Sequence, residues 1–216
     1  MSVLTWDGVG KKEFEVGVSK GVLYLYDDTA QKWLGVPWNG LTNVTESPEG
    51  GDAEEFYADN ILYAVLRGNE TFGGSIESFT YPVEFEACIG HAELGTGVYI
   101  GQQTRKTFAL AYRSEVGNDT NPNSGYKLHL VYNCTANASE MSHDTTEDSP
   151  NLEPMSFDYK STPTPVGGNH KPTCSVTIDS RTVSSTALTA IENALYGTEN
   201  ADAYLPLPDQ LLTMLG

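Results

Sequence analysis

The chain is 216 residues long and strongly acidic, with 29 Asp and Glu side chains against 12 Lys and Arg and a formal net charge of −17. This length is typical of one all-β domain or of two small domains. The charge excludes an autonomous DNA- or RNA-binding protein, because neutralising phosphates takes clustered Lys and Arg. It also disfavours docking on an anionic membrane surface.

Neither a membrane-spanning helix nor a secretory signal is expected. No stretch approaches ~18 consecutive apolar residues, and the N-terminal region carries Lys11, Lys12 and Glu13 instead of an apolar run. We therefore expect synthesis in a cytoplasm. An odd number of widely spaced cysteines then predicts buried, reduced thiols at Cys88, Cys134 and Cys174.

Alternating apolar and polar residues predict short strands in the first 45 residues. Residues 14–18 and 22–26 alternate on either side of a Lys-Gly pair, and this pattern predicts a hairpin. Residues 33–36 and 41–45 flank an Asn-Gly pair, which is typical of a tight hairpin turn. A second strand pair is predicted there.

An acidic segment follows at residues 46–60 (ESPEGGDAEEFYADN), with six carboxylates, two glycines, one proline and no cation. This composition predicts an exposed, mobile loop and not a packed strand. On its far side, residues 61–66 and 75–80 are predicted to form long strands.

Residues 82–90 predict a short helix, because proline opens the segment, glutamates occupy its first turn and glycine closes it. Two strongly alternating segments come next, at residues 104–114 and 126–136. Turn-forming residues fill the interval between them. We therefore predict an antiparallel hairpin.

The last third of the chain begins with a second acidic loop, predicted at residues 139–153. Strands are expected at residues 155–159 and 173–180. The C-terminal segment, residues 182–216, is predicted to be helical, with a first helix that ends at Gly197 and a short amphipathic turn near the end. The chain as a whole is predicted to be mainly β.

No motif for catalysis or for a nucleotide is present, so we expect no enzyme, no catalytic residues and no cofactor. Residues 119–125 resemble the start of a calcium loop. However, Gly125 lies one place too late and Leu130 replaces the bidentate carboxylate. Cys88 and His91 form only half of a zinc site. No metal site is therefore expected.

Seven short stretches, in matching order along nearly the whole chain, carry a resemblance to a known family. They are residues 36–41 (VPWNGL), 79–90 (FTYPVEFEACIG), 162–166 (TPTPV), 171–173 (KPT), 176–180 (VTIDS), 190–198 (AIENALYGT) and 205–209 (LPLPD). Together they resemble the tail tube (major tail) proteins of long-tailed, siphovirus-type bacteriophages.

This resemblance implies an antiparallel β-barrel or β-sandwich with a short flanking helix and a C-terminal helix, over a single tail-tube domain at residues 1–216. It also implies a virion structural protein that assembles in the host cytoplasm. Its homo-hexameric rings stack into a hollow tail through which double-stranded DNA passes. The implied partners are the tape-measure protein, the tail tip and the tail terminator.

The negative charge of the chain suits such a conduit. A wall of Lys and Arg binds DNA through many phosphate contacts, whereas an acidic wall repels phosphates within about a Debye length, ~10 Å at 0.1 M salt. Whether the acidic residues face the lumen or only aid solubility is left open by the sequence.

Stacked rings need head-to-tail contacts that do not close, together with cyclic contacts that do. Open strand edges are expected to supply the cyclic contacts. The acidic segment at residues 46–60 is the candidate for reaching the adjacent ring, where its carboxylates meet cations. The candidate inter-ring residues are Glu46, Glu49, Asp52, Glu54, Glu55, Asp59, Arg67, Arg105 and Lys106.

Two alternatives stay open at this point. The first is a tube protein of a contractile or type VI secretion-like injection machine, which shares the fold and the ring. The second is a β-sandwich carbohydrate-binding module, for which the tyrosines together with Trp6, Trp33 and Trp38 supply an aromatic platform.

Overall fold

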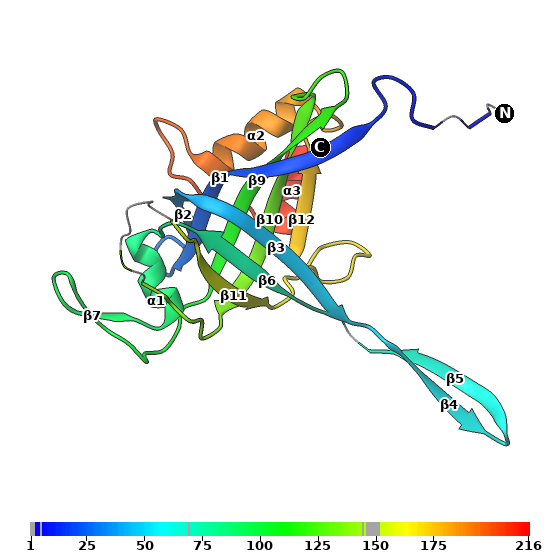
Figure 1. The fold of residues 1–216 in the computed structure, drawn as a ribbon, viewed down its shortest axis with the longest axis horizontal. Helices are drawn as coiled ribbons and strands as arrows, with labels where there is room; N and C mark the ends of the chain where they lie inside the picture. The colour runs from blue at the N-terminus through cyan, green and yellow to red at the C-terminus, as the bar shows by residue number, and fades with distance from the viewer. Residues whose placement is uncertain (1–2, 5, 69, 144, 146–151) are drawn as a thin grey trace.

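The computed structural model describes residues 3–4, 6–68, 70–143, 145 and 152–216. Its centre is an eight-stranded antiparallel sheet, with strand order β2-β1-β9-β10-β11-β6-β3 and with β12 paired to β10 (Figure 1). The strands of this sheet are β1 (Glu13–Asp27), β2 (Lys32–Trp38), β3 (Leu41–Gly50), β6 (Glu70–Ser78), β9 (Phe108–Asn118), β10 (Gly125–Ala136), β11 (Met155–Ser161) and β12 (Ser175–Asp179).

Two separate hairpins and four short helical segments complete the described part of the chain. None of these helices is long and apolar enough to cross a membrane. The predicted mainly β, antiparallel fold class is confirmed, and the sheet does not close into a barrel. The remaining elements are β4 (Ala53–Ala58), β5 (Ile61–Arg67), β7 (Ala92–Gly95), β8 (Val98–Ile100), η1 (Val83–Phe85), α1 (Glu86–Ile89), α2 (Ser185–Tyr196) and α3 (Pro208–Leu215).

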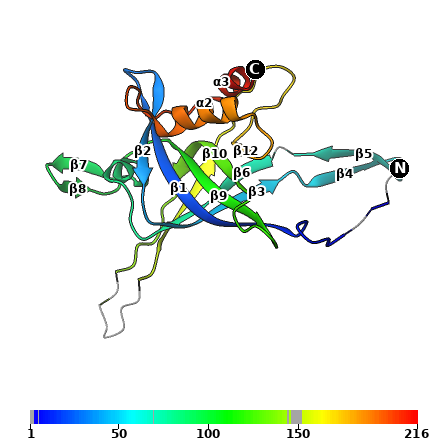
Figure 2. The same cartoon turned by 90° about the horizontal axis from the view of Figure 1, so that it is seen from above.

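Both faces of the sheet are covered. Alternate side chains of a strand point to opposite faces, and in β1 Leu23 joins one buried cluster while Val22 and Tyr24 join another. The first cluster combines residues of β1, β6, β9 and β11 with η1 and α1, so it lies inside the curl of the sheet. The second includes Ile191 of α2 and Leu211 of α3, which cover the other face (Figure 2).

The buried hydroxyl of Tyr24 connects the sheet to the end of α2. It donates a hydrogen bond of 2.7 Å to the backbone carbonyl oxygen of Leu195, and burial raises the pKa of this phenol. Tyr24→Phe leaves that buried carbonyl unpaired, so we expect a loss of about 1–3 kcal/mol in the free energy of unfolding. Urea unfolding measures it. Tyr26→Phe, at an exposed position of the same strand, serves as the control, and equal losses in both variants would contradict the assignment.

The predicted hairpin at residues 14–26 is wrong, because these residues form one continuous strand, β1. Its register against β9 shifts between Val16 and Ser19 and again between Ser19 and Val22. Gly17 (φ 74°) and Lys20 (φ 49°) adopt the left-handed conformation at these irregularities. The Lys-Gly pair therefore marks a bulged bend within a strand and not a reversal of the chain.

The predicted pairing of residues 33–36 with residues 41–45 is also wrong. Strand β2 pairs with β1, whereas β3 pairs with β6 at the other end of the sheet order. Gly40 has a positive φ of 79°, as expected for an Asn-Gly turn. The chain here nevertheless crosses from one end of the curled sheet to the other.

The acidic segment at residues 46–60 is exposed as predicted, but it is not a loop. Strand β3 continues to Gly50, and Ala53–Ala58 forms strand β4. Asp59 (φ 51°) and Asn60 (φ 62°) then make a two-residue turn into β5. Two successive left-handed residues are typical of a type I′ hairpin turn. Carboxylates are compatible with this ribbon because those from Glu49 to Asp59 stay in solvent, while the half-buried Glu46 accepts a hydrogen bond from Tyr112.

Several other predictions are confirmed. The short helix at residues 82–90 is present as η1 and α1, and it ends at Gly90 with a φ of 90°. Strands β9 and β10 form the predicted antiparallel hairpin, and β11, β12 and α2 lie where they were expected. Cys88, Cys134 and Cys174 are buried free thiols. Within the second acidic loop, residues 144 and 146–151 lie outside the described residues.

An ion-pair network connects β12 to the start of β1. The Arg181 guanidinium donates to both carboxylate oxygens of Asp179, at 3.0 and 2.8 Å, and lies 3.0 Å from Glu13 Oε1. The hydrogen bonds from Arg181 lower the pKa of Asp179 from 3.8 to about 2. A carboxyl group whose pKa is lowered by folding stabilises the fold at any pH above its pKa in the unfolded chain. This contribution is lost as the pH falls towards 2.

Asp179→Asn is therefore expected to lower the melting temperature at pH 7 and to have less effect at lower pH. Because both side chains of the pair remain partly exposed, we expect a loss of about 1 kcal/mol, or roughly 2–4 °C for a chain of this size. Differential scanning calorimetry from pH 7 down to pH 2.5 measures the difference from the wild type. A difference that is independent of pH would contradict the ion pair as its cause.

Candidate assembly surfaces

The most exposed element of the fold is the hairpin of β4 and β5, residues Ala53–Arg67, which we call the arm. It continues the direction of β3 and β6 and extends far from the sheet (Figure 1). Strands of six and seven residues correspond to a length of roughly 20 Å. Between β3 and the arm, Gly50 and Gly51 adopt positive φ values of 84° and 78°. Two left-handed glycines thus separate β3 from the arm.

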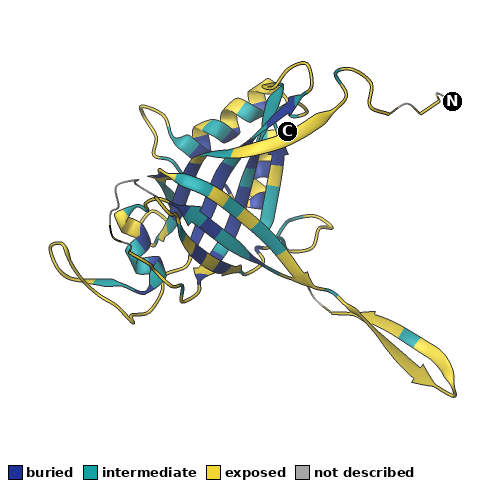
Figure 3. Cartoon of the chain, in the orientation of Figure 1, coloured by how far each residue is buried: buried dark blue, intermediate teal, exposed yellow. Residues whose placement is uncertain are grey.

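Both faces of the arm combine carboxylates with large apolar side chains. Glu54 lies opposite Leu66 on one face, and Glu55 lies opposite Val65 on the other. Figure 3 shows that nearly the whole arm is exposed. A free two-stranded hairpin is only marginally stable in water, and exposed apolar surface of this kind marks interaction sites. The exposed large apolar residues are Phe56, Tyr57, Ile61, Leu62, Tyr63, Val65 and Leu66.

A second hairpin, β7 and β8 at Ala92–Ile100, projects from the opposite end of the molecule. Figures 1 and 2 both place it at the other end of the longest axis from the arm. It too presents apolar side chains to solvent, with Leu94 71% and Val98 52% exposed, and Tyr99 and Ile100 also exposed. The molecule therefore carries two different apolar projections, one at each end.

Two cations lie at the base of the β7–β8 hairpin. The Arg105 side chain donates to the carbonyl oxygen of Ile89, and the backbone N–H of Lys106 donates to that of Ala87, at 3.3 and 2.9 Å. These bonds hold the segment against α1. Among the described residues, neither cation makes an ion pair.

The candidate inter-ring residues are separated into three groups. Glu54, Glu55 and Asp59 belong to the arm, and Asp52 precedes it, but Arg67 lies on this same arm, opposite Ala53. Arg105 and Lys106 are bonded to α1, which lies towards the other end of the molecule from the arm (Figure 1).

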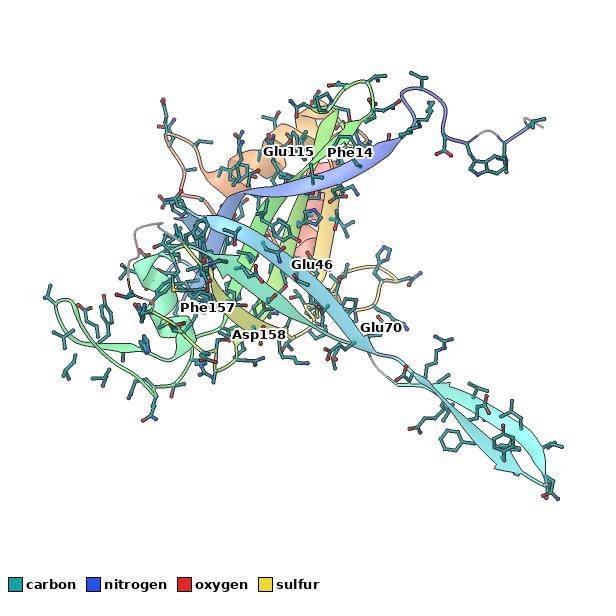
Figure 4. The ribbon with its side chains drawn as sticks, in the orientation of Figure 1. Phe14, Glu46, Glu70, Glu115, Phe157 and Asp158 are labelled. Atoms are coloured by element: carbon teal, nitrogen blue, oxygen red, sulfur yellow. The ribbon has the colours of Figure 1, made fainter. Side chains whose placement is uncertain are left out.

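The third group, Glu46 and Glu49, is bonded within the subunit. Glu46 lies over the sheet and away from the arm (Figure 4) and accepts a hydrogen bond of 2.8 Å from the Tyr112 hydroxyl. Glu49 pairs with Lys160 Nζ at 3.0 Å.

A seam between β1 and β3 forms a cavity of about 390 Å³. On its floor, His129 stacks on Tyr112 at 4.6 Å, with Nε2 2.8 Å from the Ser114 hydroxyl. Glu15 accepts hydrogen bonds from Lys127 and Ser114, and these bonds lower the pKa of its carboxyl. Sequence reasoning missed this polar cluster. Its only signal was the placement of polar residues on one face of two otherwise apolar strands.

Two open strand edges border this seam. Strand β3 ends the sheet order, and β2 pairs with β1 only over residues 21–27, so residues 13–19 of β1 have an unpaired outer edge within the described chain. In contrast, the outer edge of β2 is covered, because Gly35 N–H donates to Ala203 and Leu205 N–H donates to Trp33. Unpaired edges are sites at which a second chain adds a strand.

The three tryptophans do not lie on one surface. Trp38 is buried, packs on Phe85 at 4.6 Å between ring centroids and donates its indole N–H to the Thr80 carbonyl. Trp33 makes an edge contact with Tyr26, and Trp6 is exposed on the N-terminal segment. The aromatic platform needed by a carbohydrate-binding module is therefore not formed by these residues.

No family model and no curated protein sequence matches the chain. Among solved structures it is similar to two parts of an extracellular contractile injection system. One is the PVC sheath/tube terminator, with 12% identity, 76% of this chain and 96% of that chain covered, and a TM-score of 0.35. The other is from the PVC sheath-tube complex, with 12% identity, 74% and 88% covered, and a TM-score of 0.32. A likeness at this level is too distant to assign a family or an activity.

Proposed function

We propose that this protein is a structural, non-enzymatic subunit of a bacteriophage tail tube that self-assembles into stacked hexameric rings. The observation that carries the proposal is the presence of two different exposed apolar hairpins at opposite ends of the molecule (Figure 2). A contact between two different surfaces is heterologous, and its repetition extends an assembly instead of closing a dimer. The ordered resemblance to tail tube proteins supports the same function.

The contacts within a ring are proposed to use the open edges of β1 and β3. Edge-to-edge pairing satisfies their backbone N–H and C=O groups and joins the sheets of neighbouring subunits. The ring number of six comes from the resemblance to tail tube proteins. Between rings, Asp52, Glu54, Glu55 and Asp59 of the arm are proposed to contact the adjacent subunit.

The proposed conduit delivers the viral genome, and its charge is suited to that use. A subunit with a net charge of −17 repels DNA phosphates at short range and offers no basic wall to retain them. The proposal places the protein in the virion tail after assembly in the host cytoplasm, with tape-measure, tail tip and tail terminator proteins as neighbours.

Sedimentation velocity of the purified full chain over a wide concentration series tests the self-assembly. We expect monomers to give way to hexamers and then to larger, heterogeneous species as the concentration rises. A monomer at every concentration, also in the presence of a crowding polymer, would overturn the proposal. A closed dimer as the final species would overturn it equally.

A further inference from the structure

We infer that the β7–β8 hairpin, with Arg105 and Lys106 at its base, is the docking surface for the arm of a second copy of this chain. This inference rests on the proposed function, because it names the surface that receives the arm in a stacked assembly. Its three supporting observations are the positions, the charges and the exposed apolar side chains of the two hairpins.

The positions of the two hairpins require the contact to be intermolecular. They project from opposite ends of the longest axis (Figures 1 and 2), so an arm does not reach the β7–β8 hairpin of its own subunit. When each arm docks on the β7–β8 hairpin of the next copy, every subunit gives one contact and receives one. Such a contact propagates as an open row.

The charges of the two surfaces are complementary. Residues 52–67 contain four carboxylates and one arginine, a net charge of −3, whereas residues 92–106 contain Glu93 and two cations, a net charge of +1. The positive sign is notable in a chain whose net charge is −17. Arg113, Lys127, Lys160 and Arg181 are each paired with a carboxylate of their own subunit, whereas Arg105 and Lys106 make no ion pair with any residue that the structure describes. Opposite charges across an interface set its orientation and its specificity.

Burial of exposed apolar side chains supplies the favourable free energy of docking in this inference. The arm exposes Phe56 and Tyr63, the latter at 76%, and the β7–β8 hairpin exposes Leu94 and Val98. Figure 4 shows side chains standing away from the ribbon on both hairpins, with no other element over them. Burial of exposed apolar surface in a shared interface stabilises both hairpins, neither of which has a core of its own.

The seam between β1 and β3 is the competing site, and its charge disfavours the arm. Its lining includes Glu15, which pairs with Lys127, and the partly buried His129, and the Glu46 carboxylate lies 3.9 Å from His129 Nδ1. A carboxylate-rich arm would place like charges close together there. This repulsion makes docking at the seam less favourable than docking at the β7–β8 hairpin, where the arm meets cations.

Cysteine cross-linking tests the contact. Tyr63→Cys and Tyr99→Cys are combined in one chain, and the three native thiols are buried, so a short bismaleimide reacts at the introduced pair. We expect a ladder of covalent multimers on a denaturing gel from assembled protein. The matched control pairs Tyr63→Cys with Val16→Cys at the seam, where we expect no ladder.

Each other outcome has a defined meaning. A ladder only with Val16→Cys would overturn the inference in favour of the seam. Tubes without any ladder would also overturn it, and the proposed function would stand. If the wild-type chain does not assemble at all, then both the proposed function and the inference fail.

Charge exchange provides a second measurement, in case the cysteine variants do not assemble. Glu54→Lys with Glu55→Lys, and separately Arg105→Glu with Lys106→Glu, are each expected to raise the critical concentration for assembly about tenfold or more. All four changes together are expected to restore it. The control adds Lys11→Glu and Lys12→Glu to the arm reversal, and equal rescue by this control would overturn the inference.

Discussion

Replacement of Ala53–Arg67 by a short Gly-Ser linker is expected to abolish tube formation and to leave the subunit folded. Within the described part of the chain, β4 pairs only with β5, and neither buried cluster contains a residue of the arm. The arm therefore does not contribute to the core, and its proposed role is in contacts between subunits. We expect the fraction of sedimenting assemblies to fall to background, while the melting temperature changes by less than about 2–4 °C, the shift that 1 kcal/mol causes in such a chain.

The matched control keeps the arm and changes only its turn. Asn60→Gly converts the turn to Asp-Gly, a sequence that is favoured in type I′ turns, so the hairpin and the assembly should both persist. Tubes formed by the armless chain would contradict the role of the arm. A large loss of melting temperature would instead show that the arm supports the fold.

Phe85→Ala is expected to cause the largest loss of stability of any change considered for the core. Phe85 is completely buried, and its ring contacts those of Trp38, Phe108 and Phe157 at centroid distances of 4.6, 5.3 and 5.2 Å. Its ring packs η1 and α1 against the inside of the curled sheet. Truncation leaves a cavity, so we expect a loss of about 3–5 kcal/mol in the free energy of unfolding.

Urea unfolding followed by tryptophan fluorescence measures this loss, because Trp38 packs on the ring that is removed. Val83→Ala is the control, since Val83 belongs to the same short helix but is 65% exposed. Its effect should stay within about 0.5 kcal/mol. A loss below about 1 kcal/mol for Phe85→Ala would contradict the central place of this ring in the core.

The central hairpin of the sheet was predictable because its pattern is local. Strands β9 and β10 alternate regularly, and their turn residues lie between them in the sequence. The bend in β1 was not predictable in this way. Gly17 and Lys20 have the positive φ values that also occur in turns, and only the pairing with β9, about 90 residues later, keeps the chain extended through them.

The strands of the arm were not predictable from the sequence for a different reason. Its exposure follows from its carboxylates, but its strands depend on partners that lie across the ribbon, such as Val65 opposite Glu55. Strand formation is governed by cross-strand packing more than by the intrinsic preference of each residue. The Asp59-Asn60 turn was a weaker signal than an Asn-Gly or Asp-Gly pair, so the sequence predicted a loop.

The grouping of the candidate contact residues depends on tertiary structure. Nothing local in the sequence indicates that Arg67 shares a hairpin with Glu54, or that Arg105 is bonded to α1, far from the arm (Figure 1). The sequence likewise hides that Glu46 is engaged by Tyr112, which is 66 residues away. The presence of acidic and basic candidate residues was predictable from the sequence. Their distribution between the two ends of the molecule follows from the topology of the sheet.

Negative-stain electron microscopy of the purified full chain over a concentration series tests the proposed tail-tube function most directly. We expect hollow tubes of uniform diameter at high concentration, built from stacked rings whose end views have sixfold symmetry. Separate monomers or closed dimers at every concentration, with no ring and no tube, would contradict it.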